Sequence, residues 1–139
     1  MLSRIICVGN GFLEEDSIGR RVYEHLVAGP LPDGVEVVDG GLAGLDLAMY
    51  LRGIRRAVFV DAVKGFGDDG HIIIMDKETV ASYADGYGHS AGLPYLFHMA
   101  DKIIEEDLPE MFLAGAENGS ADAELMARVC LEVALNEQA

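Results

Sequence analysis

Short apolar runs alternate along this chain with stretches in which apolar residues recur every third or fourth position. The runs predict strands at residues 3–8, 35–39, 56–61, 70–75 and 111–113. The helical spacing predicts helices from residue 16 or 17 to the Gly29-Pro30 pair, and over residues 45–51, 93–106 and 121–135. This alternation is typical of a three-layer α/β/α sandwich with a twisted, mostly parallel five-stranded sheet. We expect one domain that spans residues 1–139.

A different pattern covers residues 79–92. This stretch is rich in small and polar side chains, which are Ser82, Asp85, Gly86, Gly88, Ser90 and Gly92. We expect a loop here, and it is long enough to carry function rather than only to connect two elements.

Three acidic positions follow the first three predicted strands. Asp16 lies in the segment after residues 3–8, Asp39 comes directly after Val35–Val38, and Asp61 follows Ala57–Val60. Ligands of open α/β sheets bind outside the carboxyl ends of the strands, so these carboxylates are expected at one edge. Such an edge suits a cation, a proton or a peptide, and it does not suit a phosphate.

Each acidic position also has a structural interpretation. Residues 14–16 could cap the first helix, and for Asp16 we weigh capping and function equally. Asp39 with Gly40 and Gly41 reads as a turn or as a contact to an extended substrate. For Asp61 we favour function over a structural hydrogen bond to a loop, because a carboxylate that ends a buried strand costs several kcal/mol unless it is paired or binds a metal.

Among the four histidines, His89 stands out because it lies in the glycine-rich stretch just before a predicted helix. We interpret His25, His71 and His98 as ordinary surface or packed histidines. Together with Asp16 and Asp61, His89 would form a set of two carboxylates and one imidazole. Such a set suits a borderline divalent metal with open coordination positions.

The net charge of −14 narrows the range of partners. Ten basic residues stand against 24 acidic ones, which argues against binding to nucleic acid or to an anionic membrane surface. No apolar stretch approaches the roughly 18 to 20 residues of a membrane span, and the first run is too short for a signal peptide, so we expect a cytoplasmic protein. Cys7 and Cys130 lie within apolar segments and read as core residues in a reducing compartment.

Five segments in this order and spacing resemble the hydrogenase maturation endopeptidase family. They cover much of residues 5–115 and are Ile6–Asn10, Glu15–Gly19, Asp39–Leu47, Phe59–Val63 and His89–Leu93. Members of this family cleave a C-terminal tail from the precursor of the large subunit of nickel-iron hydrogenases, after nickel has been inserted. The resemblance implies the α/β/α fold that the pattern predicts and this endopeptidase activity.

The resemblance also assigns roles to residues. The metal-contacting positions of the family fall on Asp16, Asp61 and His89, and Asp16 and Asp61 are then the catalytic acids. Asp39, Gly40 and Gly41 would contact the substrate. The metal would be nickel supplied by the substrate, although zinc or cadmium could occupy the site in vitro. We expect the precursor as partner, and a monomer rather than an oligomer.

The chemistry of hydrolysis is left open between two routes. A metal-polarised carbonyl could be attacked by water that a carboxylate activates, or a carboxylate could act as general base without the metal. Two other functions also remain open. One is a non-catalytic α/β module that binds a metallated precursor or a peptide tail, and the other is a hydrolase of similar architecture that acts on a small amide or ester.

Overall fold

The computed structural model describes residues 2–9, 17–42, 45–83, 93–104 and 107–136. Its strands are β1 (Ser3–Val8), β2 (Val35–Gly41), β3 (Arg56–Val63), β4 (Ile72–Asp76) and β5 (Glu110–Glu117). Its helices are α1 (Ile18–Val27), the 3-10 helix η2 (Leu45–Leu51), α2 (Lys77–Ala81), α3 (Leu93–Ile103) and α4 (Ala123–Leu135).

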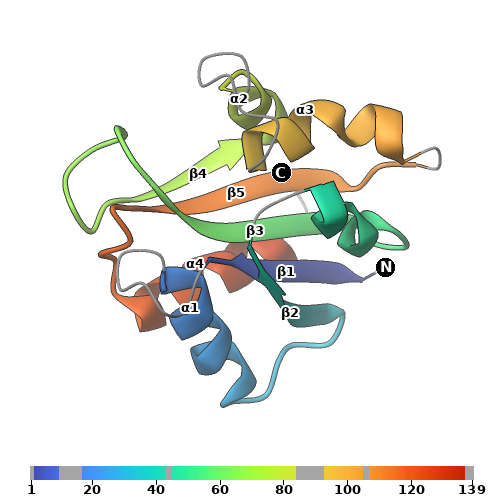
Figure 1. The fold of residues 1–139 in the computed structure, drawn as a ribbon. Helices are drawn as coiled ribbons and strands as arrows, with labels where there is room; N and C mark the ends of the chain where they lie inside the picture. The colour runs from blue at the N-terminus through green and yellow to red at the C-terminus, as the bar shows by residue number, and fades with distance from the viewer. Residues whose placement is uncertain (1, 10–16, 43–44, 84–92, 105–106, 137–139) are drawn as a thin grey trace.

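The five strands form one sheet in the order β2-β1-β3-β5-β4 (Figure 1). The pairs β1 with β2, β1 with β3, and β3 with β5 are parallel, whereas β4 runs antiparallel to β5. Because four strands are parallel, their carboxyl ends meet at one edge of the sheet. The predicted fold, a three-layer sandwich with a mostly parallel five-stranded sheet, is confirmed.

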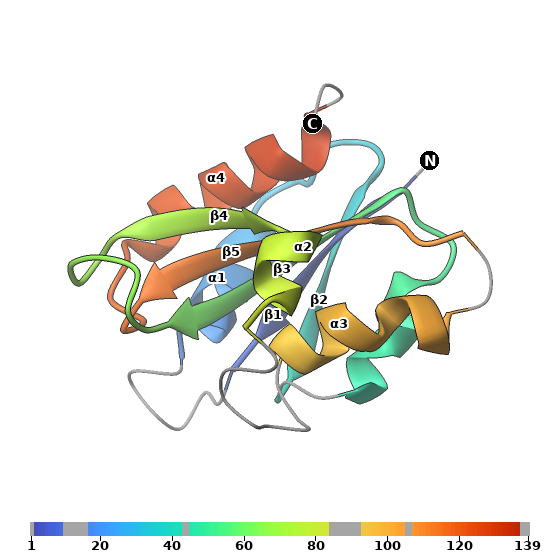
Figure 2. The ribbon, with the colours of Figure 1, turned by 90° about the horizontal axis from the view of Figure 1, so that it is seen from above.

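Helices cover both faces of the sheet, and each face has its own apolar core. One core joins the sheet to α1 and α4, and the other joins it to η2, α2 and α3. Figure 2 shows α2 and α3 on one side of the strands and α1 and α4 on the other. The first core contains Ile18, Val22 and Leu26 of α1, at the spacing that predicted this helix.

The position of α1 against the sheet depends on Gly19. A Cβ atom added at this residue would lie 2.2 Å from the carbonyl oxygen of Val8 and 2.8 Å from its amide nitrogen. The first turn of α1 therefore touches the backbone at the end of β1. This contact brings the start of α1 to the carboxyl edge of the sheet.

Two predictions about individual elements need correction. The loop predicted over residues 79–92 begins later, because Lys77–Ala81 form α2, whose N-cap is Asp76. The Asp76 carboxylate accepts a hydrogen bond of 2.9 Å from the Thr79 amide. Hydrogen bonding from the Thr79 side chain, and then from this amide, lowers the pKa of Asp76. The last strand is longer than the predicted residues 111–113, since its pairing with β3 continues to Glu117. No helix in the part of the chain described here is long and apolar enough to cross a bilayer.

Candidate active site at the carboxyl edge of the sheet

Strand register brings Asp39 and Asp61 to the carboxyl edge. Cys7 of β1 pairs with Asp39 on one side and with Val60 on the other. Asp39 of β2 and Val60 of β3 therefore lie opposite each other across β1, and Asp61 lies one residue further toward the carboxyl edge. The expectation that these two residues share the carboxyl edge of the sheet is confirmed.

Asp61 is half-buried within β3, one residue past the buried run that ends at Val60. Its Oδ1 atom accepts a hydrogen bond of 2.8 Å from the amide of Ala62. On the neighbouring strand its register partner is Gly115, which adds no side chain beside the carboxylate. A carboxylate in this setting is held in place by a local bond and lies at the edge where ligands of such sheets bind.

Asp39 is held by a different set of contacts. Its Oδ2 atom lies 2.7 Å from Nη1 of Arg20 on α1, and its Oδ1 atom accepts a bond of 3.2 Å from the Gly41 amide. The ladder to β1 skips Gly40, because Cys7 pairs with Asp39 and Val8 pairs with Gly41. This bulge and the positive φ of Gly41 (70°) turn the chain at the strand end. The turn interpretation of this segment is thus supported by its geometry.

The side chains of Asp39 and Asp61 face opposite sides of the sheet. Asp39 is the register partner of Cys7, so the two side chains face the same side of the sheet. Cys7 belongs to the core beneath α1 and α4, and Asp39 pairs with Arg20 of α1. Asp61 follows Val60 of that same core and therefore points to the other face, as Phe59 does. The structure thus brings the two residues to one edge but separates their carboxylates by the thickness of the sheet.

Asp16 and His89 lie outside the described residues, so their convergence with Asp61 stays a prediction. Their flanking residues are described. Ser17 precedes α1, whereas Tyr83 and the buried Leu93 stand on either side of residues 84–92. Within the described ranges, no three His, Cys, Asp or Glu side chains lie together as a group that could hold a metal ion.

The two cysteines are buried, as predicted, and they do not provide a nucleophile. Burial raises the pKa of Cys130 to about 12, and burial with the nearby Cys130 and Asp39 also raises the pKa of Cys7. A nucleophilic thiol requires the thiolate form. Peptide hydrolysis by a cysteine nucleophile is therefore not supported by either residue.

Two residues near the edge were not singled out from the sequence. Arg20 carries no local signal, because its partner Asp39 is distant in sequence and meets it only through the packing of α1. Glu117 ends β5 and is 3% exposed. An acid directly after the apolar segment Met111–Ala116 was a visible signal, of the same kind that pointed to Asp61.

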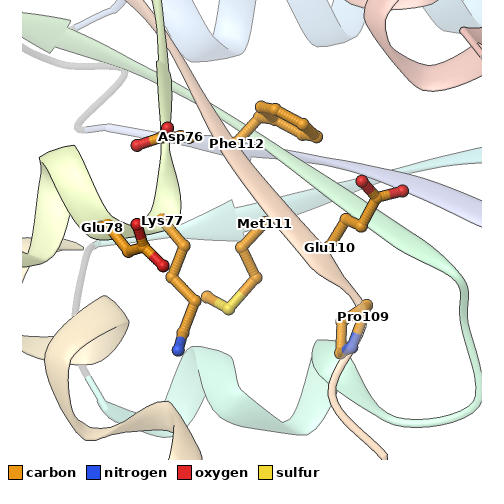
Figure 3. A pocket seen from close by; sticks show the side chains of 7 residues that line it. All are labelled: Asp76, Lys77, Glu78, Pro109, Glu110, Met111 and Phe112. Carbon is orange, nitrogen blue, oxygen red and sulfur yellow. The ribbon is translucent and has the colours of Figure 1, made fainter. Parts of the chain in front are cut away.

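A separate cleft lies away from these residues, where β4 ends and β5 begins (Figure 3). Its volume is about 210 Å³, and its walls are Asp76, Lys77, Glu78, Pro109, Glu110, Met111 and Phe112. Because β5 starts at the amino edge of the parallel strands, this cleft is remote from Asp39 and Asp61. It contains no residue of the predicted site.

Comparison with protein families and known sequences gives consistent matches. The family model described as hydrogenase maturation protease matches residues 20–129. The hydrogenase 3 maturation protease of Escherichia coli K12 is 29% identical over 119 residues, which are 84% of this chain and 73% of that protein. The hydrogenase 2 maturation protease of the same strain is 32% identical over 93 residues, covering 64% of this chain and 57% of that protein.

Solved structures agree with these matches. The hydrogenase maturating endopeptidase HybD from Escherichia coli superposes with a TM-score of 0.71 and 26% identity, over 97% of this chain and 90% of that one. The NiFe hydrogenase maturation protease HycI from Thermococcus kodakarensis has a TM-score of 0.74 at 21% identity, over 97% and 93%. The second similarity shows a shared fold. Both extend over nearly the whole chain.

Proposed function

Because this chain belongs to the hydrogenase maturation protease family and is thereby a peptidase, we propose that it removes the C-terminal tail from the precursor of the nickel-iron hydrogenase large subunit after nickel insertion. The observation that carries the proposal is the position of Asp61. It is a half-buried carboxylate near the carboxyl end of the central strand β3, within the segment that matches the family. Ligands of this class of sheet bind at that edge. The proposed setting is the cytoplasm, with the enzyme acting as a monomer.

In this proposal, Asp16, Asp61 and His89 recognise the nickel ion of the substrate. Two carboxylates and one imidazole on separate segments make a poorly preorganised site, and ordering them costs entropy. We therefore expect the isolated protein to bind divalent metals, including zinc and cadmium, only weakly. A nickel ion already seated in the precursor brings its other ligands with it, which restricts cleavage to matured precursor.

Asp39, Gly40 and Gly41 are proposed to contact the precursor. Space at Gly40 is tight, because an added Cβ would lie 3.0 Å from Cγ2 of Ile6 and 3.1 Å from Cδ2 of Leu47, and these side chains would have to shift slightly. The backbone of this turn is thus kept close to the sheet, with the Asp39 carboxylate fixed by Arg20 on its α1 side. Contacts to the precursor from this face would complement those of Asp61 on the other face.

For the hydrolysis itself, two routes stay open. In both, water attacks the scissile carbonyl carbon, the carbon–nitrogen bond breaks and the leaving amine gains a proton. Asp16 or Asp61 takes the proton of the attacking water, either with the carbonyl polarised by the nickel of the substrate or without that polarisation. The buried cysteines take no part in either route.

The proposal is tested by incubating the protein with nickel-loaded and metal-free precursor at equal concentrations. We expect a mass loss equal to a C-terminal peptide for the nickel-loaded precursor alone. Equal cleavage of both, without an effect of chelator, would remove the metal from the mechanism, and the pH–rate profile should then show carboxylate titration. A stable complex without mass loss would favour a non-catalytic binding module.

Asp61→Asn tests the proposed role of that carboxylate. The substitution keeps the volume and an acceptor for the Ala62 amide, so the fold should persist. We expect the rate of precursor cleavage to fall by at least about 100-fold, as for the loss of a general base. The matched control is Asp33→Asn, an exposed position before β2, which should cleave at the wild-type rate. Wild-type cleavage by Asp61→Asn would make Asp61 a structural residue.

A further inference from the structure

The buried carboxylate of Glu117 has no role in the chemistry proposed above. It lies at the end of β5, 3% exposed, on the same edge as Asp61. Its Oε2 atom accepts a hydrogen bond of 2.8 Å from the Gly65 amide, and its Oε1 atom accepts one of 2.7 Å from the Phe66 amide. Both oxygens are thus committed to the turn that follows β3.

This turn carries an aromatic contact to the next part of the chain. The ring of Phe66 meets the ring of Tyr83 edge-on, with 5.4 Å between ring centroids and 76° between ring planes. Tyr83 directly precedes the stretch 84–92, which contains His89. The contacts therefore run from Glu117 through the Phe66 amide to Tyr83, which lies just ahead of a predicted site residue in the sequence.

The same residues lie on the Asp61 face of the sheet. Asp61 pairs with Gly115, and Val63 pairs with Glu117. Val63 is thus two residues beyond Asp61 on β3, and Glu117 is two residues beyond Gly115 on β5. Side chains two residues apart on a strand share a face. Val63, Phe66 and Tyr83 also pack against the core beneath η2, α2 and α3.

We propose that Glu117 is a positioning residue for the Asp61 side of the site. Its carboxylate holds the turn after β3 and thereby sets the Phe66–Tyr83 ring pair beside that face. The inference rests on the proposed function for its effect on cleavage, but the coupling from Glu117 to Tyr83 is measurable without any substrate. A glutamine at position 117 would offer one acceptor to two amide donors and would turn an NH2 group toward one of them.

The first measurement uses NMR on the protein alone, with Glu117→Gln as the variant. We expect the amide protons of Gly65 and Phe66 to exchange at least about tenfold faster than in the wild type, and the ring signals of Tyr83 to shift. The matched control is Ser3→Ala, which removes a buried hydrogen bond of 3.0 Å to the Ala134 carbonyl at the opposite edge. It should leave these signals unchanged.

The second measurement is cleavage of nickel-loaded precursor at a temperature where every variant is fully folded. We expect Glu117→Gln to lower kcat by about tenfold with little change in KM, whereas Ser3→Ala keeps the wild-type kcat. Tyr83→Ala should lose as much as Glu117→Gln, and Tyr83→Phe, which keeps the ring, should cleave at the wild-type rate. If Glu117→Gln does not fold, the comparison of Tyr83→Ala with Tyr83→Phe still tests whether the ring pair positions the site.

Two results would overturn the proposal. One is unchanged exchange of the Gly65 and Phe66 amides and unshifted Tyr83 signals in Glu117→Gln. The other is a kcat of Glu117→Gln and Tyr83→Ala equal to that of Ser3→Ala. If the wild type itself cleaves no precursor, the proposed function fails, and the NMR result alone then upholds or overturns the coupling.

Discussion

Buried thiols give the protein a pH dependence that can be tested at single residues. Burial raises the pKa of Cys130 to about 12 from its ordinary value of 9.0, and the pKa of Cys7 is raised as well. Above pH 9 the unfolded chain loses these protons and the native chain does not. The contribution of these thiols to the free energy of unfolding is therefore fully present below pH 9. It is lost as the pH rises toward 12, by about 1.4 kcal/mol per pH unit for each thiol.

Cys130→Ala isolates the contribution of one thiol. We expect its free energy of unfolding, measured in urea from pH 8 to 11, to fall less steeply with pH than that of the wild type. The comparison uses slopes, because the substitution also lowers the stability at every pH through the lost side-chain volume. Parallel pH profiles for the two proteins would show that the native thiol ionises as readily as the unfolded one.

At the scale of elements, the docking of α1 on β1 depends on the missing side chain of Gly19. Gly19→Ala would place a methyl group 2.2 Å from the Val8 carbonyl oxygen, and because the neighbour is backbone, the helix has to move. We expect a loss of about 2 kcal/mol in the free energy of unfolding, measured in urea.

Gly29→Ala is the matched control for this element. It follows α1, and an added Cβ meets no atom within 4 Å there. We expect it to leave the stability unchanged or to raise it by less than about 1 kcal/mol. Equal losses for both alanine variants would contradict a close contact at Gly19.

For the whole molecule, Arg56 ties the amino edge of the sheet to the end of α4. Its side chain is 1% exposed, and it donates to the carbonyls of Val133 (2.7 Å) and Asn136 and to the carboxylate of Glu110 (2.8 Å). Its guanidinium also lies 5.5 Å from the centroid of the Phe112 ring. We expect Arg56→Met to lower the free energy of unfolding in urea by about 3 kcal/mol, since it leaves these partners unpaired.

Arg128→Met offers a control on the same helix. Arg128 is exposed on α4, and its substitution should change the stability by less than about 0.5 kcal/mol. Both variants should cleave precursor at the wild-type rate per folded molecule, because Arg56 lies at the edge opposite Asp61. A small effect of Arg56→Met on unfolding would show that α4 is held by its apolar face alone.

The elements with strong local patterns were predictable from the sequence. Prediction and structure agree to within about two residues for the strand Ser3–Val8 and the helices Ile18–Val27 and Ala123–Leu135. The reason is that the spacing of apolar residues within a buried strand or an amphipathic helix already shows which residues are buried. The helix Lys77–Ala81 was missed, since five residues give too short a window for periodicity. The antiparallel direction of β4 was also not predicted, because strand direction is set by the path of the chain rather than by composition.

For the candidate site, too, some features were predictable from the sequence and others were not. By itself the sequence determined that Asp39 and Asp61 end two apolar strands that are successive along the chain, which is enough to bring them to one edge of a parallel sheet. Only the tertiary structure decided that their carboxylates face opposite sides, that Arg20 holds Asp39, and that Glu117 holds the turn after β3. The physical reason is register. A side chain changes face with every residue along a strand, so its face depends on pairing between strands that are distant in sequence.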